Sequence, residues 1–266
     1  MKRTLLTPSE ADVLLASLPQ ELRAEVQGAA LYNSSCSPEA RVYLIDRDGG
    51  YYLKTNAKGT LRLEAEMTSY FHGKGLGAEV MHYSSSERDW LLTRRVAGED
   101  CTHAQYLDDP RRLTVLIAER LRMLHETECG DCPVQDRMGA YLALAEENYR
   151  TGNYDKSAFP DSFGYRSAEE AYAVLREGGH LLSNEVLLHG DYCLPNIMLD
   201  DWRFSSFIDL GNGGVGDRHV DLFWGAWTLN FNLKTDRYRS LFYDAYGRDK
   251  IDEDLIRIVA AAEVFG

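Results

Sequence analysis

Three polar side chains stand at a spacing that suits the handling of a phosphate and a hydroxyl group. Residues 189–196 read HGDYCLPN, so Asn196 comes five positions after Asp191. Asp209 follows thirteen residues after Asn196, at the end of an apolar run and just before Leu210 and Gly211. Magnesium prefers oxygen ligands and takes only one or two from a protein beside those of a phosphate. Asn196 and Asp209 therefore form a candidate magnesium site, and Asp191 is a candidate base for an attacking hydroxyl.

The order of these residues indicates phosphoryl transfer. Protein kinases use H-R-D-x-x-x-x-N and a later D-F-G aspartate for the same two tasks. A tight turn would explain Asp209 to Gly211 alone, but it would not explain their place after the first motif. The sequence contains no G-x-x-x-x-G-K-[ST] segment, which excludes a P-loop enzyme.

A lysine that could bind the phosphates lies near the end of an earlier strand pattern. Residues 50–54 read GYYLK, and Lys54 corresponds in position to the lysine of the kinase motif V-A-I-K. We expect Lys54 to pair with Glu66 on the following helix, with Glu64 as the competing partner. A lone strand lysine is commonly a solvated edge residue, so this prediction depends on its order relative to Asp191. The phosphate-covering loop is expected at 33–38, where the backbone N–H of Ser37 could bind a phosphate.

The hydrophobic pattern predicts an α+β fold with two parts to hold these residues. Strands over 40–45 and 50–54 form a predicted hairpin, and a helix over 61–72 and strands over 79–83 and 89–93 follow. One strand pair, over 185–188 and 204–208, interrupts an otherwise helical remainder. Helices are expected over 111–126, 138–149, 167–176, 220–230, 236–246 and 252–264. The predicted domains are a small β-rich one with one main helix, 1–97, and a larger helical one, 98–266.

The amino-acid composition limits the kinds of molecule that the protein is expected to bind. The formal net charge of −13 disfavours nucleic acid and suits a cationic small molecule, although acidity can also serve solubility alone. No stretch reaches the roughly 18 apolar residues of a membrane span, and the N-terminal segment turns polar early. We expect a cytoplasmic protein without a membrane partner, either a monomer or a weak homodimer.

On these residues the sequence resembles the aminoglycoside phosphotransferases, and most of all their 3'-phosphotransferase branch, the kanamycin kinases. The resemblance covers nearly the whole chain, and its most specific segments are 188–196, 207–221, and Leu124-His125 followed by 131–133. It implies a bilobal protein-kinase-like fold, with Mg²⁺ as cofactor and ATP or GTP as phosphoryl donor. It also implies transfer of the γ-phosphate to a hydroxyl, the 3'-hydroxyl, of an aminoglycoside antibiotic, which gives resistance.

The resemblance assigns roles to the residues above. Asp191 becomes the catalytic residue, Asn196 and Asp209 the magnesium ligands, and Lys54 with Glu66 the phosphate-binding pair. It implies adenine between the lobes and near Tyr52, with hinge hydrogen bonds from the chain at Arg94 to Val96. Asp217 and Asp221 become scaffold residues that brace the catalytic loop.

On the acceptor side, the family binds amino sugars through carboxylates of a helical insertion and at the C-terminal end, where an acidic residue and a terminal Phe are typical. The matching residues here are Asp155, Asp161, Glu263 and Phe265. This sequence departs from the family pattern at Ala262 and Asn212, and Gly266 extends past the usual terminal Phe. Two alternatives remain open, a metabolic kinase of the same fold that acts on an amino alcohol or a sugar, and a nucleotide-binding regulator without catalysis.

Overall fold

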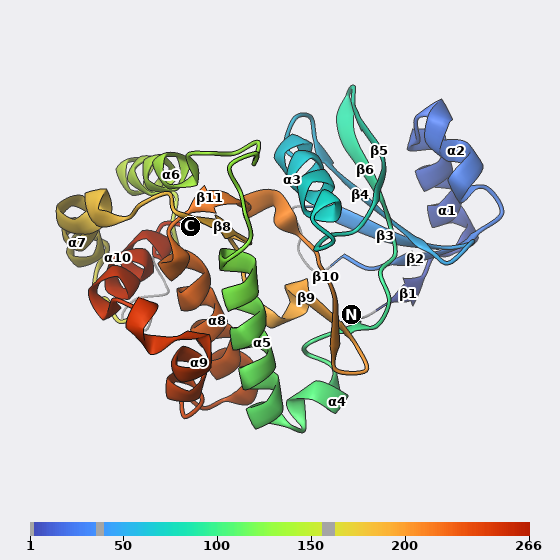
Figure 1. Ribbon diagram of the computed structural model, residues 1–266. Coiled ribbons are helices and arrows are strands. Elements are labelled where there is room, and N and C mark those ends of the chain that lie inside the picture. The colour runs from blue at the N-terminus through green and yellow to red at the C-terminus, as the bar shows by residue number, and fades with distance from the viewer. Residues whose placement is uncertain (1–2, 36–39, 156–162) are drawn as a thin grey trace. The chain divides into compact units, whose positions relative to one another are not determined.

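A computed structural model describes residues 3–35, 40–155 and 163–266 of the chain. The chain divides into two compact units, which we describe separately (Figure 1). The first comprises Met1–Asp100 and Pro195–Gly211, and the second Cys101–Leu194 and Asn212–Gly266. The first stretch of the first unit ends at Asp100, three residues after the expected domain boundary at 97. The segment 195–211 belongs to the first unit as well, although the sequence pattern places it in the second domain.

The first unit is built on an antiparallel sheet, in which the described residues form six strands in the order β1-β2-β3-β4-β6-β5. Its strands are β1 (Thr4–Leu5), β2 (Ala30–Asn33), β3 (Arg41–Asp46), β4 (Tyr51–Ala57), β5 (Val80–Ser85) and β6 (Arg88–Arg94). The predicted β3–β4 hairpin is confirmed. Its turn holds Asp48, Gly49 and Gly50 at positive φ, a conformation that glycine adopts at little cost.

Helices cover both faces of this sheet (Figure 1). Trp90 and Leu92 of β6 pack with Leu14 and Leu22, which belong to α1 (Pro8–Ser17) and α2 (Gln20–Val26). Leu91, the residue between them, packs instead beside α3 (Arg62–Gly73). Successive strand residues point to opposite faces, so α1 and α2 lie on one face of the sheet and α3 on the other.

A second hairpin completes the first unit. It consists of β9 (Ile197–Asp200) and β10 (Arg203–Phe207), and β9 also pairs with the short β7 (Glu99–Asp100). Gly98 makes the last pairing possible, because a Cβ at this position would lie 2.0 Å from the carbonyl oxygen of Leu199. The Phe207 ring packs edge-on against Phe71 of α3, with the ring centroids 6.2 Å apart. The hairpin is thereby fixed against the helix that faces Lys54.

The strands expected over 185–188 and 204–208 do not pair with each other, so this prediction is wrong. Both strands form, but β8 (Val186–Leu188) pairs with β11 (Gly214–Gly216), and β10 pairs with β9. The β9–β10 turn contains only Asp201 and Trp202, both at positive φ. Two such residues make the tight turn that suits a hairpin, although this turn has no Asn-Gly or Asp-Gly sequence to signal it.

The second unit is mainly helical, as the pattern predicts. Its α-helices are α4 (Ala104–Leu107), α5 (Pro110–His125), α6 (Arg137–Thr151), α7 (Ala168–Gly178), α8 (Arg218–Leu233), α9 (Arg239–Tyr246) and α10 (Glu253–Glu263). Val220 and Phe223 of α8 share a buried cluster with Ile258 and Val259 of α10. Within the described residues, no helix combines the length and the apolar composition that a membrane crossing would need.

Candidate active site

In the first unit, Lys54 binds two carboxylates at once. It lies on β4, and its Nζ donates to Glu64 Oε1 and Oε2 at 2.9 and 2.8 Å and to Asp209 Oδ1 at 2.8 Å. Glu64 comes from α3, and Asp209 follows the hairpin strand β10. A single ammonium thus joins β4 and α3, which are neighbours in the sequence, to Asp209, which lies 155 residues after Lys54.

The expected partner of Lys54, Glu66, is wrong, and Glu64 takes its place. Glu66 accepts instead from Arg62 Nε at 2.8 Å, one helical turn earlier on the exposed side of α3. Helical residues two positions apart point to nearly opposite sides. Because Glu64 is buried and faces β4, Glu66 cannot face it as well.

Burial and charge set the protonation of this cluster. Burial lowers the pKa of Lys54, but the Glu64 and Asp209 carboxylates outweigh it and leave the pKa raised. Burial raises the pKa of Glu64, and the neighbouring Asp209 carboxylate adds to that rise against the opposing effect of Lys54. Two carboxylates beside one ammonium leave an excess of negative charge, which a cation near Asp209 would neutralise.

The backbone segments that carry the two predicted magnesium ligands are joined at the base of the second hairpin. Ile208 N donates to the carbonyl oxygen of Asn196 at 3.0 Å, so the backbone brings Asp209 close to Asn196. Asp209 has φ 60°, and this left-handed conformation turns the chain sharply after β10. Its side chain is 52% exposed, so it can reach a ligand as well as Lys54. An amide oxygen and a carboxylate are donors that fit Mg²⁺.

The structure describes three of the residues that are expected near the nucleotide, namely Tyr52, Arg94 and Val96. Tyr52 is partly buried on β4, and its hydroxyl accepts from Arg3 Nη2 at 3.2 Å. Arg94 ends β6, where its side chain pairs with Glu79 at 2.9 Å. Val96 follows in a partly buried position. Ser37 lies outside the described residues, and adenine binding by this region stays a prediction.

In the second unit, Asp191 lies in a loop whose backbone is held from α8. Asp221 accepts from the backbone N–H groups of both His189 and Gly190, each at 2.8 Å. Gly190 has φ 82°, and a Cβ there would lie 1.9 Å from the carbonyl oxygen of Asn212. The prediction that Asp221 braces this loop is confirmed.

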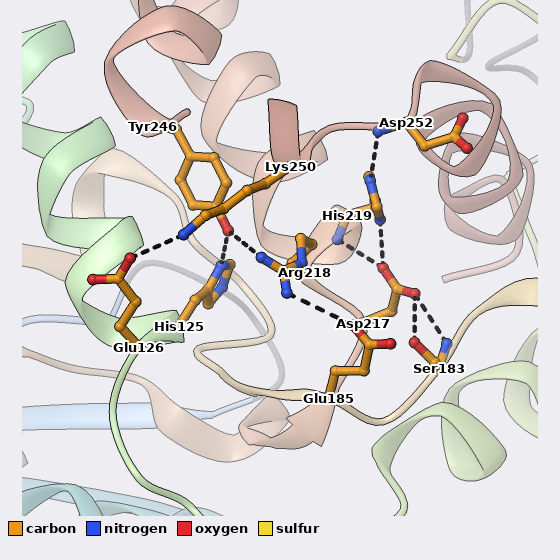
Figure 2. A network of polar contacts seen from close by, with 10 residues as sticks. All are labelled: His125, Glu126, Ser183, Glu185, Asp217, Arg218, His219, Tyr246, Lys250 and Asp252. Carbon is orange, nitrogen blue, oxygen red and sulfur yellow. Dashed lines mark hydrogen bonds and ion pairs between the residues drawn. The ribbon is translucent and has the colours of Figure 1, made fainter. Parts of the chain in front are cut away.

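The brace continues to α5 and α9 through a buried histidine. His125 Nε2 lies 3.2 Å from Asp221 Oδ2. On the other side of the ring, Nδ1 lies 2.8 Å from the Tyr246 hydroxyl (Figure 2). Burial lowers the pKa of His125 and keeps the ring neutral. Since a carboxylate can only accept, Nε2 carries the proton and Nδ1 accepts from Tyr246.

Asp217 fixes the start of α8, as expected of a scaffold residue. It accepts from the N–H of His219 at 2.9 Å, from His219 Nδ1 at 2.6 Å and from the N–H of Ser183 at 2.9 Å (Figure 2). Burial alone would raise the pKa of Asp217, but these hydrogen bonds outweigh it and lower the pKa. His219 Nε2 in turn accepts from the N–H of Asp252, which precedes α10.

Among the predicted acceptor residues, Glu263 has the most distinctive surroundings. Its Oε1 accepts from the Tyr141 hydroxyl at 2.8 Å and from Trp224 Nε1 at 3.0 Å. Burial raises the pKa of Glu263 to about 7, and the nearby Asp191 carboxylate adds to the rise. Sequence reasoning missed Tyr141 and Trp224, because no local pattern connects either residue with Glu263.

The other three residues predicted to bind the acceptor are Phe265, Asp155 and Asp161. The Phe265 ring is fully buried against Tyr149, Tyr154 and Tyr172, and its carbonyl oxygen accepts from Asn148 Nδ2 at 2.7 Å. These contacts anchor the C-terminal segment, and the role of Phe265 toward an acceptor stays a prediction. Asp155 is exposed just after α6, and Asp161 lies outside the described residues.

The sequence is similar to those of known phosphotransferases. A model described as the phosphotransferase enzyme family matches residues 33–257. A probable aminoglycoside 3'-phosphotransferase of Lactococcus lactis subsp. lactis is 48% identical over 258 residues, which are 97% of this chain and 98% of that protein. An aminoglycoside 3'-phosphotransferase of Niallia circulans is 32% identical over 208 residues, 77% of this chain and 79% of that one.

Solved structures agree on the fold. The crystal structure of a type VIII aminoglycoside-3'-phosphotransferase is similar with a TM-score of 0.77 and 22% identity, over 93% of this chain and 97% of that one. An aminoglycoside phosphotransferase from Streptomyces rimosus, solved with ADP and streptomycin, has a TM-score of 0.76 and 24% identity, over 98% and 99% of the two chains. The expected protein-kinase-like α+β fold is confirmed. With a family model that spans most of its length and a relative that is 48% identical almost from end to end, this chain belongs to the phosphotransferase enzyme family.

Proposed function

We propose that the protein is an aminoglycoside 3'-phosphotransferase, which moves the γ-phosphate of ATP or GTP to the 3'-hydroxyl of an aminoglycoside in the cytoplasm and so gives resistance. The observation that carries the phosphoryl-transfer part is the position of Lys54 Nζ, 2.8 Å from both Glu64 and Asp209. The names of the relatives that share almost the whole length of the chain support the choice of acceptor.

Each group has a distinct task in the proposed reaction. Phosphoryl transfer passes through a loose transition state, so the protein acts mainly by positioning the reactants and by balancing charge. Lys54, oriented by Glu64, binds the phosphates of the donor. Asp191 orients the acceptor hydroxyl and takes its proton. Mg²⁺, held by Asn196 and Asp209, would neutralise charge on the phosphates.

Two features support a cationic acceptor. Glu263 is a partly buried carboxylate near Asp191, and a shielded carboxylate is a strong partner for an ammonium group. The formal net charge of −13 attracts cations over a longer range. A metabolic kinase that acts on an amino alcohol or a sugar remains the alternative to be tested directly.

The test compares Asp191→Ala with the unmodified protein. We expect turnover of an aminoglycoside to fall by a factor of about 10³, the scale of a lost general base, while ATP binding persists. Nucleoside diphosphate release is measured with kanamycin-type and neomycin-type drugs, choline and simple sugars, and the phosphorylated hydroxyl is located by nuclear magnetic resonance.

Asp200→Ala, which removes an exposed carboxylate at the end of β9, is the matched control and should keep full turnover. Normal turnover by Asp191→Ala would refute the assignment of the base. Turnover of choline or a sugar in place of every drug would instead favour the metabolic alternative.

A further inference from the structure

A cavity of about 730 Å³ lies in the second unit, next to the buried histidine behind the catalytic loop. It is lined by His125, Glu126, Glu185, Arg218, His219 and residues 249–253. Small-molecule sites have volumes of roughly 300–1,000 Å³, so the cavity is large enough for a ligand. Most of the lining side chains are charged, and a ligand that binds here must carry charge as well.

The two kinds of charge occupy different depths of this cavity. The side chains of Arg218 and Lys250 are 22% and 37% exposed, whereas those of Glu185 and Glu126 are 61% and 55% exposed. The other carboxylates of the lining are exposed too, and they are Asp249, Asp252 and Glu253. The cavity is therefore positive toward its floor and negative at its rim.

The contacts that Arg218 makes in the cavity are long. Its Nη2 lies 3.6 Å from Glu185 Oε2, and its Nη1 donates to the Tyr246 hydroxyl at 3.5 Å (Figure 2). A guanidinium has five N–H donors and binds a carboxylate best through two of them, at shorter distances than these. Arg218 can thus gain from a closer carboxylate. Lys250, whose Nζ donates to Glu126 at 3.0 Å, is the second cation beside it (Figure 2).

We propose that this cavity binds a small zwitterion, with its carboxylate on Arg218 and Lys250 and its ammonium group beside Glu126 and Glu185. A simple anion would be repelled by the five carboxylates of the lining, and a simple cation would meet the two cations of the floor. A zwitterion satisfies both regions. Once its carboxylate takes the two cations, the two glutamates are released to bind its ammonium group.

A chain of hydrogen bonds connects this cavity with the catalytic loop. The Tyr246 hydroxyl accepts from Arg218 and donates to His125, and His125 in turn donates to Asp221. Asp221 holds the backbone of the loop that carries Asp191. A ligand that draws Arg218 away from Tyr246 weakens this chain, so its binding slows the transfer step without touching a reacting group.

The first experiment measures binding by isothermal titration calorimetry. The probes are the zwitterions β-alanine and 6-aminohexanoate, with hexanoate and hexylamine as probes of a single charge. At least one zwitterion should bind about 10-fold more tightly than either single charge, and Arg218→Met should weaken its binding about 10-fold, the scale of a charged hydrogen bond. Lys250→Met, which breaks only an exposed ion pair and so leaves the fold intact, should weaken it about 3-fold. Arg111→Met, at an exposed arginine on α5, is the matched control and should leave the affinity unchanged.

The second experiment measures the effect of the bound zwitterion on turnover. At saturation it should lower kcat about 3-fold, which corresponds to one weak hydrogen bond. Tyr246→Phe removes the hydroxyl that joins Arg218 to His125, so this variant should bind the zwitterion and show no further fall in kcat. Binding at the acceptor site would instead raise KM for the acceptor and leave kcat unchanged.

Four outcomes would overturn this inference. They are no saturable binding of either zwitterion up to about 20 mM, equally tight binding of hexanoate or hexylamine, an affinity that neither Arg218→Met nor Lys250→Met changes, and an unchanged kcat at saturation. Calorimetry requires no turnover, so a failure to bind leaves the proposed function intact. Absence of phosphorylation with every acceptor would reject the proposed function but not the binding of the zwitterion.

Discussion

At the scale of single residues, the pairing of Lys54 shows how helix phase selects one of two glutamates. Glu64 and Glu66 are equally plausible from composition, and their positions differ by only two residues. Two residues correspond to about 200° around a helix, so only one of the pair can face β4. The sequence predicts the lysine, but the choice of its partner depends on where α3 contacts the sheet.

Glu64→Gln is expected to lower kcat/KM for ATP by about 10- to 100-fold, because Lys54 loses the carboxylate that orients it. Glu66→Gln, the matched control, removes only an exposed pair with Arg62 and should change kcat/KM by less than about 2-fold. Steady-state kinetics with ATP as the varied substrate decides the question. A larger loss in Glu66→Gln than in Glu64→Gln would contradict the pairing.

At the scale of elements, the catalytic loop depends on helices that contribute no reacting group. His125 at the end of α5 and Tyr246 at the end of α9 continue the hydrogen bonds of Asp221, which belongs to α8. Three helix segments are thus joined at one buried point behind the loop. The segment Leu124-His125 stands out in the sequence, but its pattern indicates only the end of a helix.

His125→Ala is expected to reduce the free energy of unfolding by about 2 kcal/mol, because it removes one buried hydrogen-bond partner from each of Asp221 and Tyr246. It should also lower kcat while KM for ATP changes little, since the loss affects the loop and not the nucleotide-binding residues. Urea denaturation and steady-state kinetics measure the two effects. His180→Ala, at an exposed histidine after α7, should change neither quantity. An unaltered kcat in His125→Ala would show that the loop holds its conformation without this brace.

Elements were predictable where their pattern is local. The helices of the second unit other than the short α4 follow from apolar periodicity, and their observed bounds differ from the expected ones by a few residues. The N-terminal helices α1 and α2 escaped prediction because they are short and partly exposed, with Val13 68% exposed on α1. The partner of β8 also escaped, because β11 lies beyond a complete hairpin in the sequence, and pairing at that distance leaves no local pattern.

At the scale of the whole molecule, the first unit takes one of its parts from a distant stretch of chain. Residues 195–211 supply Asn196 and Asp209 to a unit that otherwise ends at Asp100. A single boundary near residue 97 cannot describe such an arrangement. The close approach of Gly98 to Leu199 allows the segment 195–211 to pack against the first stretch of this unit. A single glycine in the sequence does not indicate which segment will pack against it.

Glu263 makes the stability of the whole chain depend on pH. Its pKa is about 7 in the folded state and 4.5 in the unfolded reference, so between these values the folded state binds more protons. The contribution of Glu263 is therefore fully present below pH 4.5 and is lost as pH rises through 7. By the usual 1.36 kcal/mol per pKa unit, the loss amounts to about 3 kcal/mol.

The corresponding test is Glu263→Gln, which keeps an acceptor for Tyr141 and Trp224 but does not titrate. The free energy of unfolding, measured from pH 4.5 to 7.5 for both proteins, should shift in favour of the variant as pH rises. A constant difference over this range would show that the carboxyl titrates normally.

The contact of Gly190 with Asn212 limits how this enzyme can change under selection. No side chain fits between the two backbones, so every substitution at position 190 would push the loop that carries Asp191 away from the strand region beside it. The exposed positions of α8 face no such restriction. Adaptation to a new drug is therefore open along the helix surface, whereas the geometry of the transfer step is fixed by a space too small for a methyl group.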